Sequence, residues 1–316
     1  METIIKDYPL PIAGLILGIL ALGNLIQSWG EIFRNVLGII GVVLLLIFIA
    51  KLIVYPKIVK EELNNPVVAS VFPTFTMAIM VLSTYIKPIS SVLANGMWLF
   101  GVLLHGFLIL WFAKKFVLNF DIKKVFPSWY IVFVGIVVGS VTAQAHGMED
   151  VGKAIFWFGF VSYLALLFPI LYRVIKIKNI PEPALPTLTI LAAPGGLCLA
   201  GYISSFTQKN IWFVYFLMLL SLIFYIIAIV LLPRLMKLKF YPSYSGFTFP
   251  LVINGIGMKL ANGFLIKSDL AIPMLKHIVT FQEIVAVLIT LYVLVKYIQF
   301  LGTLGRFNLK AKETIS

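Results

Sequence analysis

Five apolar stretches of this chain each contain a proline. These prolines are Pro11, Pro73, Pro127, Pro194 and Pro250, and their stretches recur about every sixty residues, alternating with five smoother ones. A proline inside a membrane helix removes one backbone hydrogen bond and bends the helix, and the freed carbonyl must then face protein or a water-lined cavity. The pattern therefore predicts ten membrane helices built as five similar hairpins, with the proline-containing helices facing inward.

The composition places the chain in the membrane class. Of its 316 residues 61% are apolar and 12% charged, and the mean hydropathy is +1.05, which exceeds what a soluble domain of this length could bury. A hydrocarbon core of about 30 Å requires about twenty apolar residues per helix. We expect spans near 9–27, 34–55, 67–86, 91–112, 126–146, 152–172, 184–205, 210–232, 244–266 and 279–302. Residues 1–316 are thus predicted to form a single all-α integral membrane domain in the lipid bilayer, with no nucleic-acid partner.

The basic residues are distributed unevenly between the predicted connections. Eighteen lie on one side of the predicted spans and six on the other, with Lys259 inside a span. The six are Arg34, Lys87, Lys153, Lys209, Lys267 and Lys276. Because positive charge is enriched in cytoplasmic connections, both termini are predicted to be cytoplasmic in a multi-pass protein of the cell (inner or plasma) membrane. The first apolar stretch is too long for a signal-peptide core, so we expect no cleaved signal peptide.

Glycines concentrate in the same odd-numbered spans as the prolines. Small residues permit close helix packing or leave a lumen free of side chains, and for any single glycine packing is the alternative explanation. We predict an inner ring of five odd-numbered helices around a pore, enclosed by an outer ring of five even-numbered helices. The predicted pore-lining or helix-kink residues are Pro11, Gly14, Gly18, Pro73, Gly135, Gly139, Pro194, Gly195 and Pro250.

The acidic residues of the chain restrict what could pass through such a pore. All twelve are predicted to lie in connections, tails or helix ends, whereas cation pathways and proton relays usually contain buried carboxylates. A pore without them in a protein of net charge +13 favours small inorganic or organic anions, or neutral solutes. Backbone amides and hydroxyl groups could supply the hydrogen-bond donors; the candidate hydroxyls are Thr74, Thr76, Ser140, Thr142, Thr187, Thr189 and Thr248.

Short motifs along the chain resemble those of one membrane protein family. They are Pro9-Leu10-Pro11 with Gly14-x-x-x-Gly18 and Ala21-Leu22-Gly23-Asn24, Phe72-Pro73-Thr74, Ala192-Ala193-Pro194 with Tyr202, and Phe247-Thr248-Phe249-Pro250. Their order is similar to that of the tellurite-resistance/dicarboxylate transporter (TDT) family, which includes bacterial TehA and the plant guard-cell slow anion channels. The resemblance implies a homotrimer of ten-helix protomers, each with a five-helix pore that a phenylalanine of the ninth helix occludes. By residue matching, this gate is Phe249.

Two site residues keep alternative explanations. A phenylalanine in a membrane helix is ordinarily a core or lipid-facing residue, and it is the adjacent Pro250 and the family resemblance that favour Phe249 as a gate. Lys259 lies about ten residues beyond Phe249, or ~15 Å along a helix, toward the exterior. It is either an anion-attracting charge in an outer vestibule or a lysine that extends to the outer headgroups. Two departures from the family pattern are Pro194-Gly195, where many members have two prolines, and Lys259 itself.

The sequence favours an anion channel or facilitator, in which anions move passively once Phe249 swings aside. One alternative is a proton-coupled secondary transporter for dicarboxylates or for oxyanions such as tellurite, which would need His105 or His146 as its titrating group. Another is a membrane enzyme or scaffold without transport. We predict that the chain is not an enzyme and has no cofactor and no metal site, because no catalytic triad, paired intramembrane carboxylates or phosphate-binding glycine loop is present.

Overall fold

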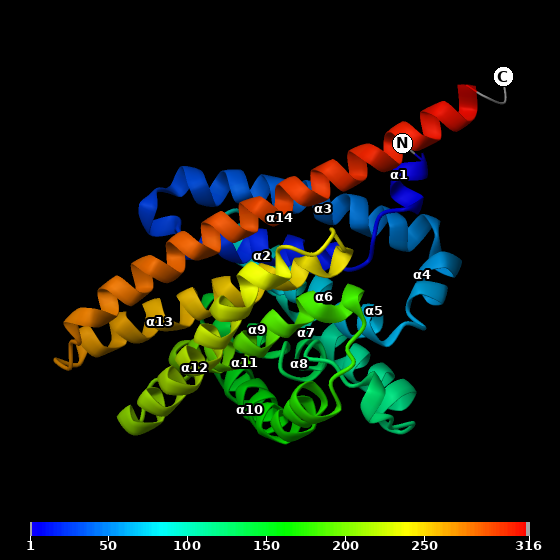
Figure 1. Cartoon of the computed structure of the whole chain (residues 1–316). Helices are drawn as coiled ribbons and strands as arrows, with labels where there is room; N and C mark the ends of the chain where they lie inside the picture. The colour runs from blue at the N-terminus through cyan, green and yellow to red at the C-terminus, as the bar shows by residue number, and fades with distance from the viewer. Residues whose placement is uncertain (1, 314–316) are drawn as a thin grey trace.

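The computed structural model describes residues 2–313, with side chains for 4–303, and all regular structure in that part is helical (Figure 1). Nine helical segments of it are long and apolar enough to cross a membrane. They are Glu31–Val54, Pro66–Ile86, Ser91–Val117, Trp129–His146, Glu149–Ile177, Glu182–Ser205, Ile211–Leu235, Pro242–Lys267 and Pro273–Thr303. A shorter apolar helix, α2 (Ile12–Leu25), precedes them.

The long segments fall into two groups by burial. In four of them 61% to 89% of the most apolar stretch is buried, and in the other five only 33% to 39%. The buried group contains α5 (Pro66–Val71) with α6 (Thr74–Ile86), α8 (Trp129–Phe133) with α9 (Val137–His146), η5 (Glu182–Ala192) with α11 (Ala193–Ser205), and η6 (Pro242–Phe247) with α13 (Phe249–Lys267). Every residue of α2 except Asn24 is also buried. We call α2 and these four the inner segments.

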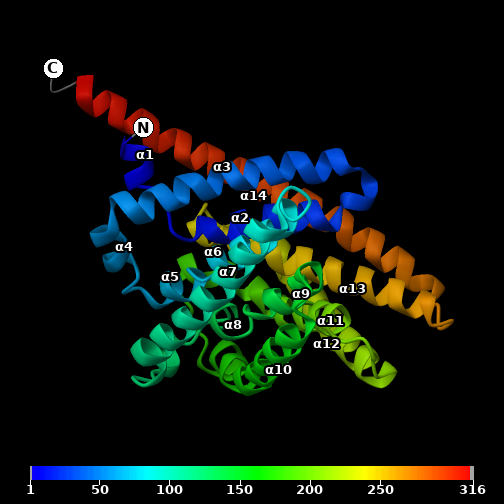
Figure 2. The ribbon, with the colours of Figure 1, turned by 180° about the vertical axis from the view of Figure 1, so that it is seen from behind.

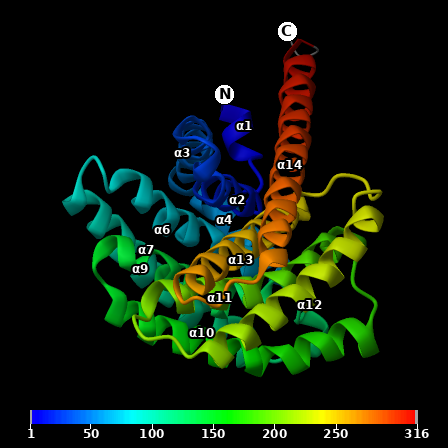
Figure 3. The same cartoon turned by 90° about the vertical axis from the view of Figure 1, so that its left-hand side faces the viewer.

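The exposed group forms the surface of the molecule. These peripheral helices are α3 (Glu31–Val54), α7 (Ser91–Phe112), α10 (Glu149–Tyr172), α12 (Ile211–Leu235) and α14 (Pro273–Glu313). They expose many large apolar side chains, such as Ile53, Leu110 and Val230, which are 71% to 73% exposed. Such surfaces are stable only against lipid or another protein. Figure 3 shows α3, α10, α12 and α14 around α2, α11 and α13.

The inner segments contact one another in a closed series. Helix α2 contacts α6, α6 contacts α9, α9 contacts α11, α11 contacts α13, and α13 contacts α2 again. Each inner segment also contacts the peripheral helix that follows it in the chain. The first and last helices, α1 (Glu2–Lys6) and α14, contact each other, and both termini lie at one end of the molecule in the opposite views of Figures 1 and 2.

Short helical pieces connect these elements at the ends of the molecule. They are η1 (Gln27–Trp29), α4 (Pro56–Glu62), η2 (Ala113–Val117), η3 (Ile122–Lys124) and η4 (Arg173–Ile177). Of these, η2 and η4 are single π-helical turns that end α7 and α10.

Prolines and glycines account for the interruptions of the inner segments. Pro73 lies between α5 and α6, and Pro194 and Pro250 lie in the first turns of α11 and α13, where a missing N–H costs little. The remaining two prolines were predicted to interrupt their spans, and this was wrong: Pro11 directly precedes α2, and Pro127 precedes α8. The interruption of the fifth span lies instead at Gly135, between α8 and α9.

Candidate functional site

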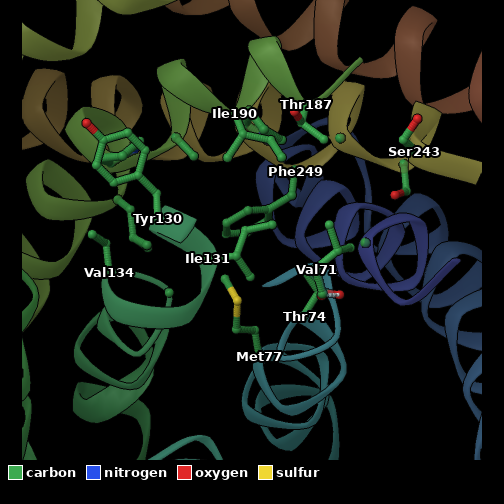
Figure 4. A pocket seen from close by; sticks show the side chains of 18 residues that line it. Val71, Thr74, Met77, Tyr130, Ile131, Val134, Thr187, Ile190, Ser243 and Phe249 are labelled. Atoms are coloured by element: carbon green, nitrogen blue, oxygen red, sulfur yellow. Dashed lines mark hydrogen bonds between the residues drawn. The ribbon is translucent and has the colours of Figure 1, made fainter. Parts of the chain in front are cut away.

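A small apolar cavity, the central cavity, lies where the inner segments are interrupted. Its volume is about 30 Å³, enough for one or two water molecules. All five inner segments contribute to its wall (Figure 4). The lining includes Gly14 of α2, Thr74 and Met77 of α6, Tyr130 and Gly135 of the α8–α9 segment, Thr187, Ile190 and Pro194 of the η5–α11 segment, and Phe249 and Pro250 of α13.

Two larger cavities lie on either side of the central cavity. The outer cavity, of about 450 Å³, is lined by later residues of the inner helices, among them Ala21, Val81 and Leu260. The basal cavity, of about 790 Å³, is lined mostly by residues that precede those helices, such as Pro11 and Pro183, together with Glu62 and Phe300. The central cavity shares Ser243 with the basal cavity and Phe249 with the outer cavity. The three cavities therefore follow one another along the inner segments.

Phe249 separates the central cavity from the outer one. It is the first residue of α13, its side chain is buried, and among the described lining residues it alone borders both spaces. Figure 4 shows its side chain among those of the other residues that line the cavity. No described aromatic ring stacks on it. The apolar side chains of Ile131, Ile190 and Leu197 line the same cavity.

Five helices begin at the central cavity. Thr74, Ala193 and Phe249 are the first residues of α6, α11 and α13, and all three line the cavity. Gly14 lies in the first turn of α2, and Gly135 lies two residues before α9. The N-terminus of a helix carries a partial positive charge of about half an elementary charge. The N–H groups in the first turns of α2, α6, α9 and α13 donate to carbonyls of the preceding residues, so they contribute here through the helix dipole and not as free donors. Five positive helix ends thus lie at the cavity, offset in part by the C-terminal ends of α5, α8, η5 and η6 that precede them, and no charged side chain lines it.

The hydroxyl groups that were expected to donate to a passing anion are otherwise engaged. All seven candidates lie within hydrogen-bond distance of a backbone carbonyl oxygen, which can only accept. At the central cavity, Thr74 donates to the carbonyl of Val71 at 2.7 Å, at the end of α5. Thr187 donates to the carbonyl of Ala184 at 2.6 Å. The expectation of free hydroxyl donors was therefore wrong, and these hydroxyls instead bond backbone carbonyl oxygens, at a helix interruption in the case of Thr74.

The outer cavity contains a cation that the sequence analysis assigned only to a connection, Arg34 of α3. Its Nε donates to Asn24 Oδ1 at 2.9 Å, a second guanidinium nitrogen donates to the carbonyl of Thr84 at 3.0 Å, and the guanidinium lies 4.2 Å from the centre of the Tyr85 ring. Asn24 and Thr84 also line the cavity. No described carboxylate lies within ion-pair distance of Arg34. Its charge is thus held at the cavity wall without a counter-charge.

Lys259, in contrast, is fully engaged. Its ammonium contacts Glu283 at 2.6 Å, the carbonyl of Leu25 at 2.7 Å and the hydroxyl of Ser28 at 2.6 Å. Glu283 also accepts from the indole N–H of Trp29 at 3.1 Å. The charge of Lys259 is compensated and does not line the outer cavity, in contrast to the free vestibule charge that the sequence suggested. Glu283 lies within α14 and is 6% exposed, so its predicted place at a helix end was wrong.

The predicted glycines separate into two kinds. Gly14 and Gly135 line the central cavity. Gly18, Gly139 and Gly195 line none of the three cavities. Close packing does not separate the two kinds, because an added Cβ would lie 3.1 Å or less from a neighbouring atom at all five positions. Of the prolines, Pro194 and Pro250 line the central cavity and Pro11 the basal cavity, whereas Pro73 lines none of the three.

The two histidines considered as proton carriers lie outside all three cavities. His105 is buried, with Nε2 donating to the carbonyl of Val132 at 3.0 Å and Nδ1 2.7 Å from the Thr76 hydroxyl. His146 contacts Ser83 and Asn95, both at 2.8 Å. Among the described residues no cluster of three metal-ligating side chains occurs. The cavities therefore contain no histidine through which a proton could be relayed.

Comparison with known proteins adds a family context. Residues 8–298 match the family model described as voltage-dependent anion channel (SLAC1). The chain is 31% identical over 183 residues to an uncharacterized transporter of Methanocaldococcus jannaschii, a match that covers 53% of this chain and 52% of the relative. It is 26% identical over 222 residues to the tellurite resistance protein TehA homolog of Haemophilus influenzae, covering 64% and 66%. The chain thus spans about half to two thirds of the length of these relatives.

Proposed function

Since the chain belongs to the voltage-dependent anion channel family, we propose that it is a channel or facilitator that conducts small anions passively through the three cavities. Phe249 is the gate in this proposal. The closed series of inner contacts supports a five-helix pore wall, with α2 as the first of ten membrane helices and the peripheral helices as the outer ring. The lysine-rich end with both termini is then cytoplasmic, and the protomers associate as the homotrimer that the family resemblance implies.

The convergence of five helix N-termini on the central cavity is the observation that carries the proposal. An anion at this point loses water, and the partial positive ends of α2, α6, α9, α11 and α13 offset part of that loss electrostatically. A cation would meet the same potential as a barrier. The cavity contains no fixed ammonium or guanidinium group that would hold an anion tightly, so an anion can also leave, as conduction requires.

The Thr74 hydroxyl strengthens the preference for anions over cations, because it donates to a carbonyl oxygen at the C-terminus of α5. The C-terminal carbonyls of α5 would otherwise present partial negative charge to the cavity, and the Thr74 hydroxyl donates to one of them, that of Val71. We expect Thr74→Val to lower the permeability ratio of chloride to potassium several-fold, since the exposed carbonyl then attracts cations. Thr74→Ser keeps the hydroxyl and should retain the ratio. Reversal potentials of reconstituted protein test this, and an unchanged ratio in Thr74→Val would contradict the covering role.

Arg34 is the proposed collector of anions in the outer cavity. One uncompensated charge about 8 Å from the path, in a dielectric of about 40, contributes roughly 1 kcal/mol, or about fivefold in local anion concentration. We therefore expect Arg34→Gln to reduce anion conductance about fivefold at 10 mM salt and much less at 1 M, where screening is strong. Lys259→Gln is the matched comparison, because its charge is already paired. An equal effect of both variants, or no salt dependence, would show that Arg34 does not act through its charge.

The function as a whole is tested by ion flux into liposomes that contain the purified protein. Passive conduction predicts uptake of chloride or nitrate down an electrical gradient, without a proton gradient and with potassium largely excluded. Strict dependence on a proton gradient would instead favour the coupled transporter. Absence of flux in both wild type and gate variants would favour the non-transporting alternative.

A further inference from the structure

A fourth cavity, outside the three already described, opens on the bilayer-facing side of the molecule. We call it the lateral groove; its volume is about 420 Å³. Three elements form it: the end of α3, the short helix α4, and the end of α7 with η2. The groove is lined by Leu52, Pro56, Val59, Lys60, Leu63, Asn64, Phe107, Leu108, Trp111 and Lys115.

The lining of the lateral groove has an apolar part and a polar, basic part. Its apolar part includes Leu52, Phe107 and Trp111, which come from peripheral helices whose other side chains face the bilayer. Its polar part contains two lysines and no carboxylate. The two carboxylates nearest in sequence, Glu61 and Glu62, do not line the groove, and Glu62 is paired with Lys51 at 2.5 Å. The lateral groove therefore combines a positive mouth with an apolar floor.

Lys115 is held in place at this mouth. Its ammonium donates to the carbonyl of Leu63 at 2.9 Å and to Asn64 Oδ1 at 2.8 Å, and it lies 5.3 Å from the centre of the Trp111 ring. A lysine has three N–H donors, so one remains for a ligand. Lys60 is exposed on α4 and close enough to Lys115 for the two charges to repel each other. Two like charges side by side without a carboxylate are stabilised by an anion between them.

We propose that the lateral groove binds one anionic phospholipid from the leaflet on the lysine-rich side of the membrane. The phosphate lies between Lys60 and Lys115, and one acyl chain lies along Leu52, Phe107 and Leu108. Charge complementarity selects this occupant, because the cytoplasmic leaflet is anionic and basic pockets between membrane helices on that side bind acidic headgroups. The partly buried Trp111 provides the amphipathic ring that is common at this depth. The proposal requires the membrane topology given above but not anion conduction.

Native mass spectrometry of detergent-purified full-length protein, titrated with phosphatidylglycerol or phosphatidylcholine, tests the proposal. Wild type should bind one phosphatidylglycerol at least about fivefold more tightly than phosphatidylcholine. Lys60→Gln should lose about fivefold in affinity for phosphatidylglycerol only, the loss expected for one lysine at an anionic lipid. Lys57→Gln is the matched control, because Lys57 is exposed on the same helix but does not line the groove. Equal binding of both lipids, or equal losses in the two variants, would overturn the proposal.

Fluorescence quenching by brominated lipid is a second measurement, and it locates the lipid. It requires no substitution of Lys115, whose hydrogen bonds to Leu63 and Asn64 hold the chain at the end of α4. Brominated phosphatidylglycerol should quench the fluorescence component that Trp111→Phe removes, and brominated phosphatidylcholine should quench it less. Quenching by neither lipid would mean that the lateral groove is covered, for instance by a second copy of the chain, and would reject a lipid occupant. The same binding measurement in the presence of 10 mM inorganic phosphate tests whether the site binds a free anion instead of a lipid. If phosphate at that concentration displaces phosphatidylglycerol, the site is assigned to phosphate alone.

Discussion

Phe249→Ala is expected to raise anion conduction at least tenfold. The substitution removes the one described side chain that borders both the central and the outer cavity, so the two spaces merge and water can enter. A gate that favours the closed position by only about 1.4 kcal/mol already holds the open fraction near one tenth. Because the helix N-termini remain in place, the added conduction should retain its preference for chloride or nitrate over potassium. Currents in planar bilayers, with the oligomer checked by size-exclusion chromatography, measure this.

Phe247 provides the matched control. It lies two residues before Phe249, is fully buried, and its ring centre is 4.7 Å from that of Tyr244, but it lines none of the three cavities. Phe247→Ala should therefore destabilise the protein, by about 3–5 kcal/mol if values from soluble cores apply, without opening the path. Phe249→Leu keeps apolar bulk and should conduct less than Phe249→Ala. A stable, non-conducting Phe249→Ala variant would reject the gate assignment.

Glu283→Gln is expected to cause the second large effect, a loss of stability without a change in ion selectivity. The carboxylate compensates Lys259 and accepts from Trp29, so it connects α13, α14 and η1 at the outer end of the molecule. Breaking a buried ion pair costs about 3–5 kcal/mol; since Lys259 is one-third exposed, we expect about 1–3 kcal/mol here. The apparent melting temperature in detergent, followed by tryptophan fluorescence, should fall by several degrees.

The double variant Lys259→Gln/Glu283→Gln separates the ion pair from other causes. If the loss arises mainly from an uncompensated ammonium, the double variant should be more stable than the sum of the two single losses predicts. Additive losses would show instead that the two side chains act independently. The chloride-to-potassium permeability ratio should stay unchanged in all three variants, because the pair lies outside the outer cavity lining.

The sequence predicted the helical membrane class because that class depends on local properties. Hydropathy and the length of apolar stretches require no knowledge of partners. Proline and glycine positions also anticipated where the inner segments are interrupted, as at Pro73, Pro194 and Pro250. The exceptions have a local cause as well: Pro127 lies two residues before α8, where its missing N–H removes no helical hydrogen bond.

The parts of the site that were missed depend on contacts between distant residues. Lys259 and Glu283 lie on different helices, and nothing in either local sequence indicates that they meet. Gly14 and Gly18 share one face of α2, yet only the first lines the central cavity, because Thr248 lies against the second. Arg34 was assigned to a connection because it lies at the start of a predicted span. Its position at the outer cavity depends on Asn24 and Thr84, which lie on inner segments.

The narrowness of the barrier at Phe249 has an electrical consequence. Cavities of about 450 Å³ and 790 Å³, when filled with water, would conduct far better than the apolar central cavity of about 30 Å³, so a membrane voltage would fall mostly over that short section while Phe249 closes it. In the proposed channel, a monovalent anion that crosses the closed gate would then traverse most of the potential in one step, gaining or losing about 2.3 kcal/mol per 100 mV. The residual current through the closed protein should thus rise more steeply than linearly with voltage, although the chain has no array of charged residues of the kind that forms a voltage sensor.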